Sequence, residues 1–62
     1  MDPARIHATV LHCLEACYQS LQPHVCLRNY AATLRADPGW READVREFER
    51  AAKRMLAELL DA

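Results

Sequence analysis

One long apolar stripe, between Asp37 and Leu60, constrains the fold of this chain more than any other feature. In this stretch apolar side chains recur at steps of three and four residues, which is the spacing of one face of an α-helix. The stripe consists of Val45, Phe48, Ala52, Met55, Leu56 and Leu59. Because the chain has only 62 residues, the remainder is just long enough to form the surface against which this helix packs.

Composition narrows the fold class to a small all-α domain. Hydrophobic residues make up 52% of the chain, and many of them are Ala and Leu, which favour helices. One Gly and three Pro provide few turns, whereas a small β fold needs many. We therefore expect residues 1–62 to form one domain, a helical hairpin followed by a longer third helix in a three-helix bundle. A chain of this size buries only about 60% of its unfolded surface, so we expect oligomerisation or a partner to complete the core.

Capping signals predict three helices, at about residues 3–21, 24–35 and 38–60. Asp2-Pro3 is typical of a helix start, because Asp accepts from the free N–H groups and Pro fits the first helical position. Pro23 predicts the end of the first helix. The apolar face of that helix consists of Ile6, Val10, Cys13, Leu14, Cys17 and Leu21.

The third helix has two candidate N-caps. Asp37 followed by Pro38 gives the longer helix, whereas Asp44 with Glu47 three residues later forms a capping-box pattern and gives the shorter one. We favour Asp37, because the longer helix includes Trp40 and places its ring over the junction with the second helix.

The segment between residues 7 and 40 resembles a single tetratricopeptide repeat. The pattern Y-x-x-x-L-x-x-D-P-x-x-x-x-A is similar to the second helix and exit turn of that repeat, and here it consists of Tyr30, Leu34, Asp37, Pro38 and Ala43. The resemblance implies a helix-turn-helix unit, with the third helix in the place of the capping helix that closes such arrays.

The cysteines and one histidine are the first candidates for chemistry. Cys13 and Cys17 lie four residues apart on one predicted helix face, and His24 and Cys26 follow just beyond the turn. If the two helices are antiparallel, these four soft ligands could hold Zn²⁺ or Cu(I) in a thiol-based metal or redox sensor. The spacing is not a usual zinc pattern, and buried Cys behaves as a small hydrophobe, so core packing is the favoured interpretation. Three cysteines without a disulfide-framework spacing predict a reducing, cytoplasmic setting.

Other classes of function find little support in the sequence. No pattern for nucleophilic catalysis, phosphate binding or a di-metal centre occurs, so we predict that the chain is not an enzyme and binds no cofactor or small-molecule substrate. Eight Lys and Arg against nine Asp and Glu argue against nucleic-acid binding, and a helix-turn-helix that reads DNA is a minor alternative. No apolar run approaches the roughly 20 residues of a membrane span, and no signal peptide is visible.

Some apolar surface remains after each helix has buried one stripe. Leu11 and Tyr18 lie beside the stripe of the first helix, and Leu60 lies off the stripe of the third. A three-helix unit covers one stripe per helix, so we expect a second copy or a protein partner to cover the rest. The sequence thus predicts an interaction module such as an adaptor, co-chaperone or regulatory subunit; single exposed Leu residues without a role are the competing interpretation. The candidate partner-binding residues are Leu11, Tyr18, Trp40, Met55, Leu56, Leu59 and Leu60.

Overall fold

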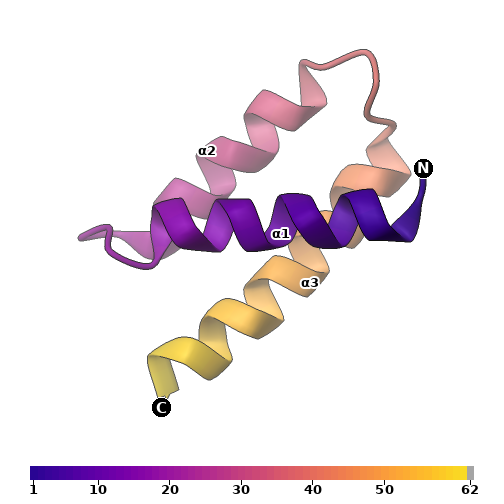
Figure 1. The fold of residues 1–62 in the computed structure, drawn as a ribbon. Helices are drawn as coiled ribbons and strands as arrows, with labels where there is room; N and C mark the ends of the chain where they lie inside the picture. The colour runs from indigo at the N-terminus through magenta and orange to yellow at the C-terminus, as the bar shows by residue number, and fades with distance from the viewer. Residues whose placement is uncertain (62) are drawn as a thin grey trace.

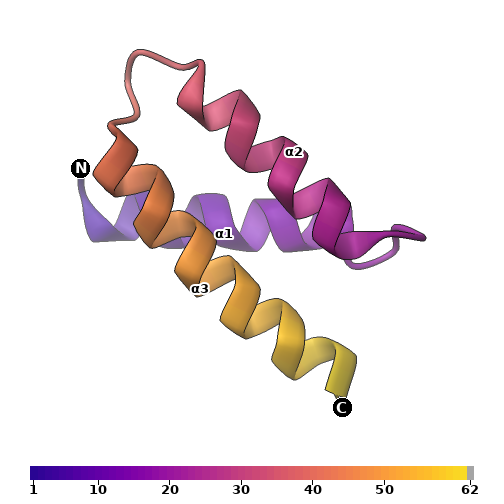
Figure 2. The same ribbon diagram turned by 180° about the vertical axis from the view of Figure 1, so that it is seen from behind.

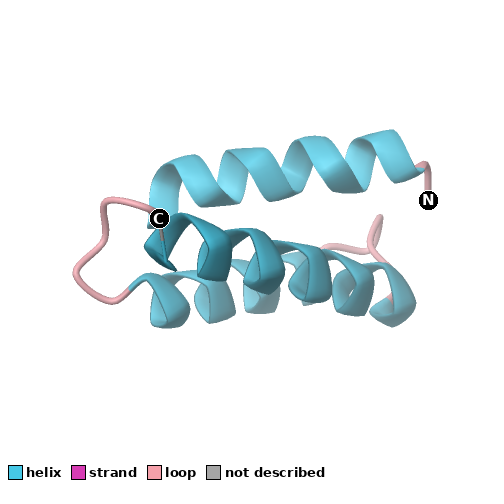
Figure 3. Ribbon diagram, turned by 90° about the horizontal axis from the view of Figure 1, so that it is seen from below, coloured by secondary structure: helices cyan, strands magenta, loops and turns pink. Residues whose placement is uncertain are grey.

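The computed structural model describes residues 1–61, which form three helices in two layers. The helices are α1 (Pro3–Cys17), α2 (Pro23–Arg35) and α3 (Glu42–Asp61). In Figures 1 and 2, α2 and α3 run side by side in opposite directions, and α1 crosses both of them. Figure 3 shows α1 as one layer and the α2–α3 pair as the other. The predicted small all-α bundle is confirmed. Within residues 1–61, none of the helices has both the length and the apolar character that a membrane crossing requires.

The first helix begins where the sequence predicts and ends earlier. Asp2 accepts a hydrogen bond from the backbone N–H of Ala4 at 2.9 Å, so the predicted cap is confirmed. The helix ends at Cys17 and not near residue 21, because the chain must reverse direction within residues 18–22 to begin α2. Leu21 continues the helical spacing in the sequence but lies in this reversal, where it is fully exposed.

The third helix begins four residues later than the favoured prediction. Residues 37–40 instead form a turn, in which the N–H of Trp40 donates to the carbonyl of Asp37 at 3.0 Å. The Asp37 carboxylate accepts from the N–H of Gly39 at 2.8 Å. Pro and Gly at the two central positions suit such a turn. Asp37 therefore supports a turn and not a helix N-terminus, and the prediction of a start at 38 is wrong.

The alternative cap, Asp44, also differs from its predicted role. Asp44 lies within the first turn of α3, and its carboxylate accepts from the backbone N–H of Arg41 at 3.2 Å. The N–H of Val45 donates to the carbonyl of Arg41 at 3.0 Å. Asp44 is thus the acidic member that reaches back in a capping box, and its negative charge is favourable at this end of the helix dipole.

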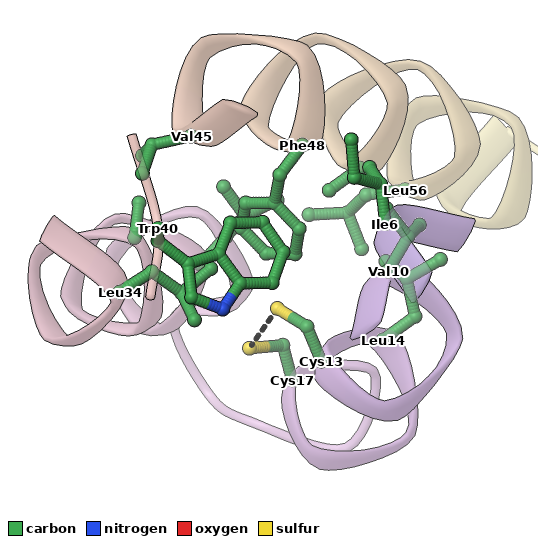
Figure 4. Packing of buried hydrophobic residues seen from close by; sticks show 13 residues of the cluster. Ile6, Val10, Cys13, Leu14, Cys17, Leu34, Trp40, Val45, Phe48 and Leu56 are labelled. Carbon is green, nitrogen blue, oxygen red and sulfur yellow. Dashed lines mark hydrogen bonds between the residues drawn. The ribbon is translucent and has the colours of Figure 1, made fainter. Parts of the chain in front are cut away.

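The core lies between the two layers and is centred on Phe48. Its ring stacks on Tyr30 of α2 at a centroid distance of 5.7 Å and meets the edge of Trp40 at 6.2 Å. Trp40 belongs to the turn before α3, yet its ring covers the α2–α3 junction as expected, and it is buried (Figure 4). The buried cluster consists of Ile6, Val10, Cys13, Leu14, Cys17, Leu27, Ala31, Leu34, Trp40, Val45, Phe48, Ala52 and Leu56.

Ion pairs join the exposed edges of α2 and α3. The Arg35 guanidinium donates to the Glu42 carboxylate at 3.0 Å and also bonds to Glu49. The hydrogen bond from Arg35 is the main reason that the pKa of Glu42 is lowered from its usual value. These contacts link the last turn of α2 to the first two turns of α3 on the exposed side of the bundle.

Candidate functional site

The C-terminal halves of α1 and α3 diverge from each other (Figures 1 and 2). Residues of these two segments line an apolar groove, here called the α1/α3 groove. It has a volume of about 440 Å³. The residues that line it are Leu11, Leu14 and Glu15 from α1, Tyr18 directly after α1, and Met55, Glu58 and Leu59 from α3. Its lining is mainly apolar, and its polar side-chain groups are the two carboxylates and the Tyr18 hydroxyl. Hydrophobic contact is therefore most of what the groove offers a ligand.

Helical spacing explains how these side chains come together. Leu11, Leu14 and Tyr18 follow one another at steps of three and four residues, so they share one face of α1. Leu14 is buried at the bottom of the groove, whereas Leu11 is 46% and Tyr18 is 53% exposed. Across the groove, Leu59 of α3 is 44% exposed. The groove therefore has a packed floor and two apolar sides that remain open to solvent.

Four of the predicted partner-binding residues line this groove, namely Leu11, Tyr18, Met55 and Leu59. Leu60 is exposed but is not among the lining residues. Trp40 and Leu56 are buried in the core, so their assignment to a partner surface is wrong.

The face of the helix on which a residue lies explains the two wrong assignments. It also explains why three groove residues were missed. Leu56 shares the inward face of α3 with Ala52 and Phe48, and this face is buried in the core, so it is not available to a partner. Leu14, Glu15 and Glu58 line the groove but were not among the predicted partner-binding residues. Their offsets from Leu11 and Met55, three or four residues along the same helices, are the signal that could have found them.

The cysteines form a compact cluster at the end of the hairpin. Cys17, the last residue of α1, is joined by a disulfide to Cys26 near the start of α2, with their Cα atoms 5.6 Å apart. The sulfur of Cys13 lies 3.8 Å from that of Cys17 (Figure 4). Burial raises the pKa of the Cys13 thiol, which disfavours its reactive thiolate form. The cysteine spacing in the sequence was interpreted as having no disulfide framework. The Cys17–Cys26 bond corrects this interpretation.

The four candidate metal ligands do not form a metal site in this structure. Cys17 and Cys26 are bonded to each other, and a disulfide sulfur is not a thiolate ligand. His24 is exposed at the start of α2, whereas Cys13 is buried. Within residues 1–61, no group of three or more His, Cys, Asp or Glu side chains is arranged to hold a metal ion.

The positive surface that a DNA-binding alternative would require is partly neutralised within the protein. Arg35 bonds to Glu42 and Glu49, and Arg46 lies 3.5 Å from the Glu42 carboxylate. Because these carboxylates lie among the arginines, they would also repel phosphates.

No protein-family model, curated protein or solved structure matches this chain. The resemblance to a tetratricopeptide repeat therefore stays a prediction.

Proposed function

We propose that this protein is an interaction module that receives an apolar helix of a partner protein in the α1/α3 groove. One observation supports the proposal above all others: Leu11, Tyr18 and Leu59 are each about half exposed and lie together around one concavity. Exposed apolar residues scattered singly are normal, but a contiguous apolar concavity is typical of an interaction site. A role as an adaptor, co-chaperone or regulatory subunit follows from such a site.

The dimensions of the groove suit a helix. Leu11 of α1 and Tyr18, the C-cap residue of that helix, are seven positions apart, which corresponds to a length of about 10 Å or two helical turns. A partner helix lying along this length would present apolar side chains at positions i, i+3 or i+4, and i+7. Its apolar stripe would bury the exposed sides of the groove, in the way that a fourth helix completes a four-helix bundle.

The test is a selection of binders from a displayed library of amphipathic helical peptides. Peptides selected on the wild-type protein are then measured against a Leu11→Ala, Leu59→Ala double variant. We expect the double variant to lose about tenfold or more in affinity, which corresponds to about 1.4 kcal/mol. Leu21→Ala is the matched control, because Leu21 is a fully exposed Leu outside the groove. Selected helices that bind both variants as tightly as the wild type would exclude the groove as their site.

We propose a thiol-based redox sensor as the second candidate function, on the basis of the Cys17–Cys26 disulfide and the third sulfur beside it. In the cytoplasmic setting that we propose for this chain, glutathione and thioredoxin keep most thiols reduced. A disulfide that forms there is transient and reports an oxidising condition. Its reduction by a dithiol takes up two electrons and two protons and releases the thiols of Cys17 and Cys26.

Thiol counting tests this second candidate. After unfolding without reductant, oxidised protein should show one reactive thiol, that of Cys13, and reduced protein should show three. Sensing further requires that the disulfide re-forms on mild oxidation, which mass spectrometry of the linked peptides detects. Three thiols in protein that has been exposed to air and a mild oxidant would rule the sensor out.

A further inference from the structure

Both charged residues that line the α1/α3 groove are acidic. Glu15 stands on α1 and Glu58 on α3, and no Lys or Arg is among the lining residues. Among residues 1–61, neither carboxylate lies within 4.0 Å of a basic group, although Glu42 and Glu49 both form ion pairs. Within residues 1–61, the groove thus has two carboxylates that form no direct ion pair.

These carboxylates lie on opposite sides of the groove. Glu15 follows Leu11 by four residues on α1, and Glu58 follows Met55 by three residues on α3. Each therefore belongs to the groove-facing side of its own helix. A helix that fills the groove would have one acidic residue beside each edge of its apolar stripe.

We propose that the partner segment is a basic amphipathic helix, with Lys or Arg along both edges of an apolar stripe of about two turns. The inference rests on the proposed function and specifies the chemistry of the partner. Apolar contact with the floor and sides supplies most of the affinity, while opposite charges at the edges select the partner and its orientation. Glu15 and Glu58 are then specificity-determining residues of the groove.

The same charges argue against a second copy of the chain as the occupant. A two-fold association places the same surface on both sides of an interface. Packed groove to groove, two copies would bring together two Glu15 and two Glu58 side chains, with no lining cation between them. Like charges held together in this way oppose association.

Three synthetic helical peptides test the inference. They share one apolar stripe and differ only at the stripe edges, which carry Lys, Gln or Glu. Fluorescence anisotropy with the full chain should give the Lys peptide an affinity about 3-fold to 10-fold higher than that of the Gln peptide, the range expected for two exposed ion pairs. The Glu peptide should bind least tightly. Added salt should reduce these differences, because it screens exposed charges.

Variants of the two carboxylates supply the controls. A Glu15→Gln, Glu58→Gln double variant should bind the three peptides with nearly equal affinity. A Glu15→Lys, Glu58→Lys double variant should prefer the Glu peptide. Glu47→Gln is the matched control, because Glu47 is an exposed carboxylate of α3 that does not line the groove, and it should keep the wild-type preference.

The outcomes separate this inference from the proposed function. Equal binding of all three peptides, weakened in each case by Leu11→Ala, would retain the groove and overturn the basic partner. If none of the peptides binds, the proposed function fails together with the inference. Sedimentation of the wild type as a dimer that Leu59→Ala dissociates would identify a second copy as the occupant and overturn the basic helix.

Discussion

Phe48 lies fully buried between the ring of Tyr30 on α2 and that of Trp40 in the turn before α3. We expect Phe48→Ala to lower the free energy of unfolding by about 3–5 kcal/mol, because it removes a whole ring from a packed core. This loss approaches the entire stability of many small domains. Chemical denaturation followed by circular dichroism measures it. Leu60→Ala is the control, and because Leu60 is exposed its effect should stay within about 0.5 kcal/mol. Equal midpoints for the two variants would contradict the central place of Phe48.

The sequence predicts the burial of some residues correctly and that of others incorrectly. Phe48 lies in the middle of a long stripe, so helical periodicity alone predicted its burial. Leu21 fits the stripe of the first helix equally well and is nevertheless exposed. The difference arises because periodicity cannot show where the chain must leave the helix in order to reverse direction. Trp40 shows the opposite case, since its ring reaches the core from a turn.

At the scale of elements, the contact between Arg35 and Glu42 links α2 to α3 and responds to pH. Because Arg35 lowers the pKa of Glu42 in the folded state, this contribution to stability is present above the unfolded pKa of Glu and is lost as pH falls through the folded pKa. We expect Glu42→Gln to be less stable than the wild type at neutral pH. The difference should shrink below about pH 4.

Thermal unfolding over a pH series measures this effect. Glu47→Gln serves as the control, since Glu47 forms no ion pair among the described residues. A difference between Glu42→Gln and the wild type that stays constant from neutral to acid pH would show that the ion pair is not its cause.

Local sequence signals predicted the start of α1 correctly and the start of α3 incorrectly. Asp2-Pro3 and Asp37-Pro38 are the same dipeptide, and both suit a helix start. The first begins α1, whereas the second begins a turn, because Gly39 follows it and the chain must bend there before α3. Which structure such a dipeptide adopts depends on the path of the chain around it, and not on the dipeptide alone.

At the scale of the whole molecule, the Cys17–Cys26 disulfide closes the α1–α2 hairpin. The two cysteines are 9 positions apart in the sequence. Closing a loop of this length restricts the unfolded chain and should stabilise the fold by about 2–3 kcal/mol. We therefore expect a reductant to lower the free energy of unfolding by this amount, as measured by urea denaturation. A Cys17→Ser, Cys26→Ser double variant should show no response to the reductant. If the reductant also leaves the free energy of unfolding of the wild type unchanged, the bond does not restrain the fold.

The groove depends on how α1 and α3 pack against each other, and neither helix forms it alone. The sequence placed Leu11 and Tyr18 beside the stripe of the first helix, and Met55 and Leu59 on the stripe of the third, and all four were predicted to bind a partner. Their meeting in one concavity depends on the angle at which α1 crosses α3, which is set by the way the side-chain ridges of the two helices interlock. The acidic character of the groove follows from the same crossing, because it places Glu15 and Glu58 across from each other.

The burial of Trp40 gives this protein a built-in optical signal. Trp40 is the only Trp in the chain, and it is buried at the α2–α3 turn, beside the start of α3. The groove lies near the other end of that helix, with Met55 about 15 residues and some 20 Å further along. The fluorescence emission of the Trp40 indole will shift to longer wavelength when the core opens to water. The same emission will change little when a ligand fills the groove. Folding and binding can thus be followed separately in one sample, without an attached dye.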